Sequence, residues 1–295
     1  MPPPAPFRAW HPHDERLLTT PEQHTLHSAG ALLTAVREAL APGTWYLKGS
    51  AALLAWSGPG ARLPEDVDLA VETEAAGPLL KAGELPARTP RTRVRILRAE
   101  PMAFHRADRP PVHRSLARVE APGLSVEVLL NLALVPRGTT AADARTGPLF
   151  FPGGPSATGV PAATFGRCLA QKLLRYTLRR SGGRIGTRWT DLLDFVLCAS
   201  SDRAPRLRLA SLRTEVAAEL EVVGRPWPEL SEPPPEWLDF WDSAMFRHRL
   251  PYGRLPEAAR SAEAFWEPVL ARHPAGRGTE ADAVWDPAAW TWSPH

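Results

Sequence analysis

The spacing of apolar residues changes character once along this chain, and that change constrains the fold more than any other feature. Up to about residue 138, helical spacing alternates with short apolar runs and then gives way to consecutive strand-like runs. Residues 138–160 are rich in Gly, Pro and Thr and show no apolar period. Every later periodic segment is helical. The pattern therefore predicts an α+β protein, in which a small mixed sheet flanked by helices precedes a mainly helical part.

The individual elements follow from the same spacing. Helices are expected in the first half from Thr20 to Leu40, begun by the cap-like Thr20-Pro21-Glu22-Gln23, and over 51–56. Strands are expected at 44–47, 67–71, 93–98, 112–120 and 124–130, and the later helices at 165–180, 189–200, 207–223, 235–246 and 256–273. We accordingly predict a proline-rich tail over 1–18, a sheet-containing domain over 19–150 and a helical domain over 151–295.

Composition excludes several classes of protein. The net charge is only +3, so any nucleic-acid surface must be a local patch. Two cysteines, Cys168 and Cys198, lie in apolar helix-like stretches and are predicted to be buried thiols, too few for a disulfide framework or a cysteine-rich metal site. No run approaches the roughly 18 apolar residues of a membrane helix. We expect a soluble, cytoplasmic protein without a membrane partner.

A Gly-Ser pair and two aspartates carry the chemistry. Gly49-Ser50 lies between a predicted strand and a predicted helix, where a phosphate can approach the backbone and the free amides of a helix start. Asp66 and Asp68 are two apart on a strand, so their carboxylates share a face and suit Mg²⁺. Glu127, on a later strand, is a candidate third ligand. Each pattern alone also occurs in ordinary turns and solvated strand ends, and the combination is the more specific signal.

Five segments together resemble one protein family. Leu-Lys-Gly-Ser-Ala-Ala-Leu at 47–53 and Arg-Leu-Pro-Glu-Asp-Val-Asp-Leu at 62–69 resemble the first motif of the AbiEii-type nucleotidyltransferases, within the polymerase-beta-like superfamily. Leu-Ala-Gln-Lys-Leu at 169–173 and Arg-Trp-Thr-Asp-Leu-Leu-Asp at 188–194 resemble the later motif, and 265–270 resembles the closing helix. Many members are the toxin of a toxin–antitoxin pair, so the resemblance implies a nucleotidyltransferase with a cognate antitoxin.

The resemblance also implies roles for individual residues. Ser50 would hold a nucleoside triphosphate, and Asp66 and Asp68 would bind Mg²⁺ or Mn²⁺. Lys172 would neutralise phosphate charge, while Asp191 would orient that lysine or the acceptor. The remaining candidates for nucleotide binding are Lys48, Gly49, Arg62 and Asp194. A strand-end lysine such as Lys48 can also simply extend to solvent, and acids such as Asp191 and Asp194 are common in the first turn of a helix.

The sequence departs from the family at three positions. Ser50 stands where a second glycine is usual, and the wider superfamily uses serine there. Pro64 replaces a serine common two residues before the first aspartate. Glu127 replaces an aspartate as the third acid, so it either binds a metal or pairs with an arginine.

Lysine is scarce, which makes each lysine informative. Of 35 basic residues only Lys48, Lys81 and Lys172 are lysines, and two of them fall in the motif segments. A compact ammonium and a planar guanidinium differ in reach and hydrogen-bond geometry. Replacing Lys172 by arginine is therefore expected to reduce activity even though the positive charge is kept.

The acceptor of the transferred nucleotide is less constrained than the site. Arginines cluster over 88–118, where Arg91, Arg93 and Arg95 are predicted to share one strand face, and over 175–188. These clusters favour an RNA acceptor, such as a transfer RNA, or they reflect an arginine-biased surface. The alternatives are a protein acceptor, a small-molecule acceptor such as an aminoglycoside, and a catalytically silent binding or regulatory relative.

Overall fold

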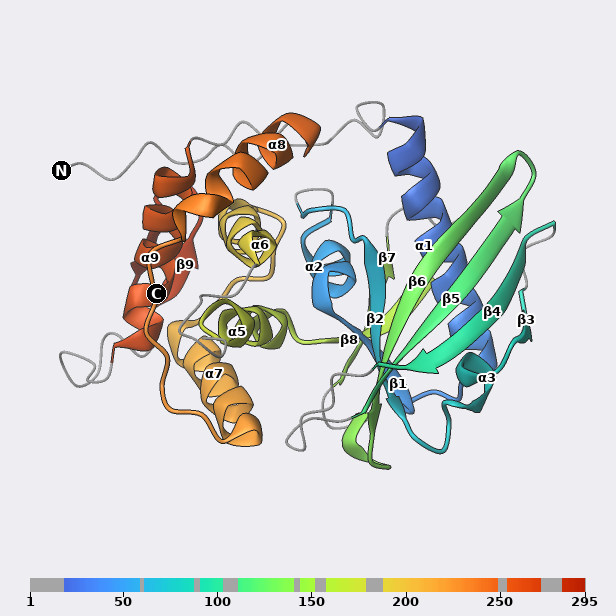
Figure 1. The fold of residues 1–295 in the computed structure, drawn as a ribbon. Helices are drawn as coiled ribbons and strands as arrows, with labels where there is room; N and C mark the ends of the chain where they lie inside the picture. The colour runs from blue at the N-terminus through green and yellow to red at the C-terminus, as the bar shows by residue number, and fades with distance from the viewer. Residues whose placement is uncertain are drawn as a thin grey trace. The chain divides into compact units, whose positions relative to one another are not determined.

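The computed structural model describes residues 19–58, 61–87, 91–102, 111–140, 144–151, 158–178, 188–248, 254–271 and 283–294. These residues belong to two compact units. The sheet unit lies within Pro12–Pro59 and Leu63–Thr164, and the helical unit within Gly60–Arg62 and Phe165–His295. The division confirms the predicted α+β class, with a mixed sheet first and helices after it (Figure 1).

The sheet unit is built on a mixed sheet whose described strands run in the order β3-β4-β5-β6-β2-β1-β8-β7. Their bounds are β1 Trp45–Lys48, β2 Asp66–Glu72, β3 Gly83–Leu85, β4 Arg93–Pro101, β5 Val112–Ala121, β6 Leu124–Val135, β7 Ala144–Phe151 and β8 Thr158–Ala163. The pairs β2–β6 and β1–β8 are parallel, and the other pairs are antiparallel. The central strand β2 therefore lies between two strands that are distant from each other in sequence.

One face of this sheet is apolar and covered by helices. The helix α1 (Thr20–Ala39) packs on β4, β5 and β6 (Figure 1), and α3 (Gly77–Leu80) packs beside β4 and β5. The covered face carries Val67 and Leu69 of β2, both buried. Since neighbouring residues of a strand point to opposite faces, Asp66 and Asp68 project from the other face.

The helical unit has a core of aromatic rings that meet mostly edge-to-face. Its elements are α5 Phe165–Tyr176, α6 Trp189–Ser200, α7 Leu209–Val223, η3 Pro235–Trp237, α8 Leu238–His248 and α9 Leu255–Leu270, with the strand pair β9 Val284–Asp286 and β10 Thr291–Ser293. Phe265 on α9 meets Trp266 and Trp285 edge-to-face, with ring centroids 5.0 and 4.8 Å apart. Edge-to-face contacts of this kind are the favoured geometry of aromatic cores. The late tryptophans thus serve packing in this unit.

Several sequence expectations need correction. The connection over 138–160, predicted without regular structure, contains β7 and much of β8, and the sheet extends to Ala163. The short elements α3, β3, β9 and β10 were not predicted. The cap of α1 is Thr19 rather than Thr20, because the Glu22 carboxylate accepts a hydrogen bond of 2.7 Å from the Thr19 amide. The prediction of two buried thiols is confirmed.

The predicted tail over 1–18 lies outside the described residues. Within the described part of the chain, no helix combines the length and apolarity required to cross a membrane.

Candidate active site

The two aspartates of β2 converge on one amide group. Asn131 of β6 donates hydrogen bonds from its Nδ2 to Asp66 Oδ2 at 2.7 Å and to Asp68 Oδ1 at 3.0 Å. The parallel register explains this, because Asp68 pairs with Asn131 across the β2–β6 ladder. The Oδ1 of Asn131 accepts a hydrogen bond of 3.1 Å from Nε of Arg114 on β5. The sheet therefore aligns Asp68, Asn131 and Arg114 in one row across three strands.

The start of α2 (Gly49–Ser57) lies directly against this carboxylate pair. In the antiparallel β1–β2 ladder, Lys48 pairs with Asp68. Gly49 follows with a positive φ of 68°, and a Cβ placed on it would be 2.2 Å from Asp68 Oδ2. Ser50, in the first turn of α2, is buried. The structure thus brings together Lys48, Gly49, Asp66 and Asp68 as the sequence predicted, with Ser50 immediately after Gly49.

This close approach yields a prediction for Gly49. Gly49→Ala is expected to destabilise the protein by more than the roughly 1–2 kcal/mol of left-handed strain on a non-glycine residue, because the new methyl would also displace the Asp68 carboxylate. Urea unfolding measures the difference. Gly43→Ala is the matched control, since Gly43 has φ of 81° and open space around its Cβ position. Equal losses of stability in the two variants would show that the Asp68 side chain moves away from the new methyl group without a measurable cost in free energy.

Glu127 does not join the two aspartates. It lies on β6 four residues before Asn131, about 13 Å along the strand, and pairs across the β5–β6 ladder with Arg118. The Glu127 carboxylate accepts a hydrogen bond of 2.6 Å from Arg118, which raises the pKa of that guanidinium. Of the two sequence interpretations, the structure favours the arginine partner. The position beside Asp68 belongs to Asn131, a lone polar residue in an apolar run that the sequence interpretation overlooked.

A second cluster surrounds Lys172 within the helical unit. The Lys172 ammonium is 2.5 Å from Asp194 Oδ2 and 3.3 Å from Asp191 Oδ1, and all three side chains are almost fully buried. Arg175 Nη2 is 2.7 Å from Asp191 Oδ1, and Arg62 Nε is 3.3 Å from Asp194 Oδ1. Residues three apart on a helix share a face, so α5 presents its two cations to the two carboxylates of α6.

These neighbours control the ionisation of Asp194. Burial by itself raises the pKa of a carboxyl group. The charges of Arg62 and Lys172, and their hydrogen bonds, outweigh burial and hold the pKa of Asp194 below its usual value. The buried Oδ2 of Asp191, in contrast, has no hydrogen-bond partner in the described part of the chain. The cluster is a charged network in which only part of the hydrogen-bonding capacity is used.

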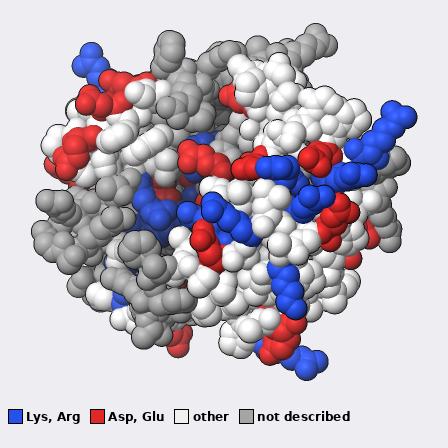
Figure 2. Space-filling model, turned by 45° about the vertical axis from the view of Figure 1, so that its right-hand side comes forward, with Lys and Arg blue, Asp and Glu red and all other residues white. Residues whose placement is uncertain are grey.

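The arginine-rich strands present mixed charge rather than a uniform basic stripe. Arg95 pairs with Glu84 at 3.1 Å, and in register Arg93 faces Glu120. Arg91 lies before β4 with a positive φ of 64°, so the predicted three-arginine face is wrong at that residue. On the right-hand half of Figure 2, basic and acidic side chains are interspersed. The predicted arginines that lie outside the described residues are Arg88, Arg106, Arg109, Arg179, Arg180 and Arg184.

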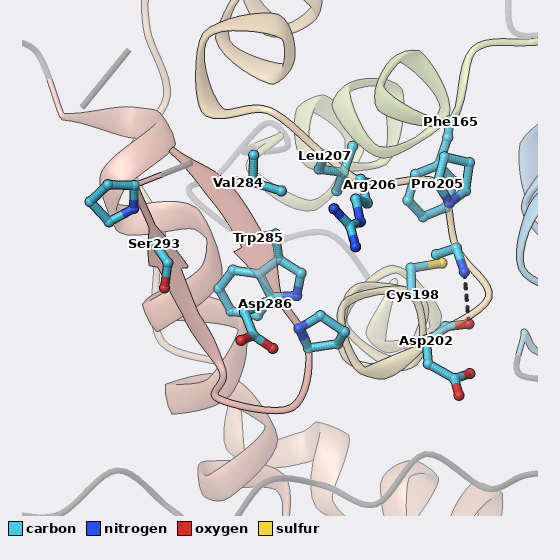
Figure 3. Close-up of a pocket in the computed structure, with 14 residues that line it drawn as sticks. Phe165, Cys198, Asp202, Pro205, Arg206, Leu207, Val284, Trp285, Asp286 and Ser293 are labelled. Carbon is cyan, nitrogen blue, oxygen red and sulfur yellow. Dashed lines mark hydrogen bonds between the residues drawn. The ribbon is translucent and has the colours of Figure 1, made fainter. Parts of the chain in front are cut away.

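The helical unit also contains a hollow of about 420 Å³. Its apolar wall includes Phe165, Leu207 and Trp285, while Arg206 and Asp202 supply charge (Figure 3). None of the residues that the sequence assigns to the site lines this hollow.

The donor set of the sheet unit suits a hard divalent cation. Mg²⁺ and Mn²⁺ prefer carboxylate oxygens, and the shared Asn131 amide marks a point that oxygens of both Asp66 and Asp68 reach. Among the described residues, no group of three or more His, Cys, Asp or Glu side chains could hold a metal ion. Asp66 and Asp68 would supply part of the six-oxygen shell that Mg²⁺ prefers, and water or substrate oxygens would supply the rest.

A mixed sheet with two convergent aspartates on a central strand, beside a Gly-Ser helix start, is the arrangement expected of a nucleotidyltransferase. The family model described as "Nucleotidyl transferase AbiEii toxin, Type IV TA system" matches residues 31–258. The match covers most of the chain, and the protein belongs to this family.

Two solved structures from Helicobacter pylori are also similar. One, described as "putative nucleotidyltransferase from H. pylori", has 16% sequence identity and a TM-score of 0.47, covering 85% of this chain and 96% of that one. The other, JHP933, has 15% identity and a TM-score of 0.43, covering 85% and 93%. No curated protein matches the sequence.

Proposed function

We propose that the protein transfers a nucleoside monophosphate from a nucleoside triphosphate to an acceptor hydroxyl. The hydroxyl oxygen attacks the α-phosphate, a new phosphodiester forms, and the bond to pyrophosphate breaks. One observation carries the proposal: Asp66 and Asp68 converge on a single point beside Gly49 at the start of α2.

The residues of the sheet unit would bind the nucleotide. Asp66 and Asp68 would hold Mg²⁺ or Mn²⁺, which when bound supplies charge neutralisation at the phosphates. The hydroxyl of Ser50 and the free amides of the first turn of α2 would hold phosphate oxygens, since a helix start favours anions. Gly49 leaves room for this approach, and Lys48 adds a cation at the end of β1.

We assign the Lys172 cluster to the same reaction as a charge-stabilising element. Lys172 would offset negative charge on the phosphates, Asp191 and Asp194 would fix its position, and Arg62 would hold Asp194. The burial of Lys172 and its contacts with two carboxylates, at 2.5 and 3.3 Å, support a role that requires one defined geometry.

Lys172→Arg is expected to lower the transfer rate at least about tenfold although the charge is kept, because a planar guanidinium cannot reproduce an ammonium between two carboxylates. Steady-state transfer by the purified protein measures this. Lys81→Arg is the matched control, since Lys81 is exposed and lies outside both clusters. Full activity of the Lys172 variant would remove the lysine from the mechanism.

The acceptor that we propose is RNA, with transfer RNA as the first candidate. Arg93 and Arg98 support this choice, because they are exposed and make no ion pair within the described residues and are therefore available to phosphates. Family membership supports a toxin role, and we propose that a cognate antitoxin restrains the protein in its host cell.

Incubating the protein with each labelled nucleoside triphosphate, Mg²⁺ and total RNA tests this function. Label entering transfer RNA, and absent with Asp68→Ala, is the expected result. Label in protein alone would replace RNA by a protein acceptor, and label in an added aminoglycoside would make the acceptor a small molecule. Absence of turnover together with absence of Mg²⁺-dependent nucleotide binding would identify a catalytically silent relative.

A further inference from the structure

The side-chain amide of Asn131 donates a hydrogen bond to each of the two carboxylates, Asp66 and Asp68, that would hold a cation. Its Nδ2 carries two hydrogens, and the two measured contacts, 2.7 and 3.0 Å, use one on each carboxylate. Two carboxylates that share a site repel each other unless positive charge lies near them. The amide supplies part of that positive charge through its N–H dipoles.

Arg114 fixes which end of the amide faces the aspartates. The Arg114 Nε can only donate a hydrogen bond, so the Asn131 atom that faces it at 3.1 Å must be the oxygen. The carbonyl oxygen, the atom that could bind a metal, is thereby turned away from the carboxylates. Asn131 is therefore a donor to the metal-binding residues and is not itself a ligand in this arrangement.

We propose that Asn131, oriented by Arg114, is a positioning residue that substitutes for the cation and holds the Asp66–Asp68 pair convergent before metal binds. This rests on the proposed function, because it assigns the pair to a divalent cation. A cation that binds the carboxylate oxygens of Asp66 and Asp68 must displace their hydrogen bonds from the Asn131 amide, so the amide competes with the cation for these oxygens. Asn131 consequently keeps the affinity for free metal low, and the oxygens of the nucleotide triphosphate complete the site.

Two substitutions separate this role from simple packing. Asn131→Ala removes the competing donor, so the metal-free protein should melt at a lower temperature and gain more from added Mn²⁺ than the wild type does. Asn131→Asp adds a third carboxylate, which should tighten Mn²⁺ binding by about tenfold or more, because affinity for hard cations rises with ligand charge. Melting curves with and without Mn²⁺, and calorimetric Mn²⁺ titration, measure these effects on the full chain without nucleotide.

Ser125→Asp is the control for the added charge. Ser125 is exposed on the same face of β6, six residues and about 20 Å from Asn131, so its variant should bind Mn²⁺ as the wild type does. A purely structural role for Asn131 predicts a lower melting temperature in Asn131→Ala with an unchanged Mn²⁺ shift, and that result would overturn the proposal. Unchanged Mn²⁺ affinity in Asn131→Asp would overturn it as well, even if Asn131→Ala does not fold.

The outcomes remain separate from those of the transfer assay. If Mn²⁺ binding responds to Asn131 but no nucleotide is transferred, the positioning role stands and the proposed function fails. If the wild type transfers nucleotides but the Asn131 variants keep its Mn²⁺ response, the positioning role alone fails.

Discussion

Asp68→Asn should reduce nucleotidyl transfer by at least about a hundredfold while leaving the protein folded. The substitution removes one of the two convergent carboxylates that would hold the cation, and it removes the negative charge closest to Gly49. Stability should be maintained, because an amide fills the same volume and the repulsion between Asp66 and position 68 disappears. Rate measurements and a melting curve on the same preparation give both quantities.

Glu127→Gln is the control for this experiment. It also removes a carboxylate from the same sheet face, but from a position that pairs with Arg118 and lies away from the aspartates. Transfer should continue at close to the wild-type rate. A loss as large as that of Asp68→Asn would show that Glu127 acts in the reaction and would restore it as a candidate metal ligand.

Asp194→Ala should destabilise the helical unit by about 3–5 kcal/mol, the usual cost of removing one partner from a buried ion pair. The variant would remove the 2.5 Å contact of the buried Lys172 ammonium with Asp194, and Arg62 would lose its ion pair with the same carboxylate. Denaturant unfolding followed by tryptophan fluorescence reports this loss well, because most of the tryptophans belong to the helical unit.

Asp202→Ala serves as the comparison, since Asp202 is exposed just beyond the end of α6 and should change stability by less than about 0.5 kcal/mol.

The stability lost on replacing Asp194 should also depend on pH. The pKa of Asp194 is lower in the folded protein than the value of about 3.9 in an unfolded chain. The stabilisation from its charge is therefore complete above that unfolded value and disappears as the pH falls through the folded pKa. A stability difference between wild type and Asp194→Asn that does not shrink in acid would contradict this assignment.

Local sequence patterns predicted most of the fold. Burial of one side of a strand or helix leaves a periodic pattern of apolar residues in the sequence, which can be recognised without a structure. Such patterns predicted the strands β2, β4, β5 and β6 and the helices α5 to α9. The strands β7 and β8 were not predicted, because the glycines and prolines in 138–160 interrupt the alternation of apolar residues that indicates a strand. The strand β8 instead forms by parallel pairing with β1. That pairing joins Leu47 to Ala162, a contact that no local window contains.

The candidate site was predictable where its geometry is local. Asp66 and Asp68 share a strand, and Asp191 and Asp194 share a helix face, so spacing alone brings each pair together. Asn131 reaches the aspartates only through the register of β2 on β6, which depends on the whole sheet. In that register Asp66 and Asp68 pair with Leu129 and Asn131, while the separate β5–β6 register places Glu127 opposite Arg118. The strand that carries Glu127 was predicted, but the pairing of that strand with its neighbours was not.

The parallel pairing of β2 with β6 has a consequence for synthesis of the chain. Asp68 and its partner Asn131 are 63 residues apart, and the strand that carries Asp68 is completed long before the strand that orients it. Pairings between such distant segments form late, because the intervening loop must close first. A ribosome that has translated only as far as β5 therefore carries both aspartates without the partner strand that aligns them. The hydrogen bonds from Asn131 to Asp66 and Asp68 can therefore form only after β6 has emerged.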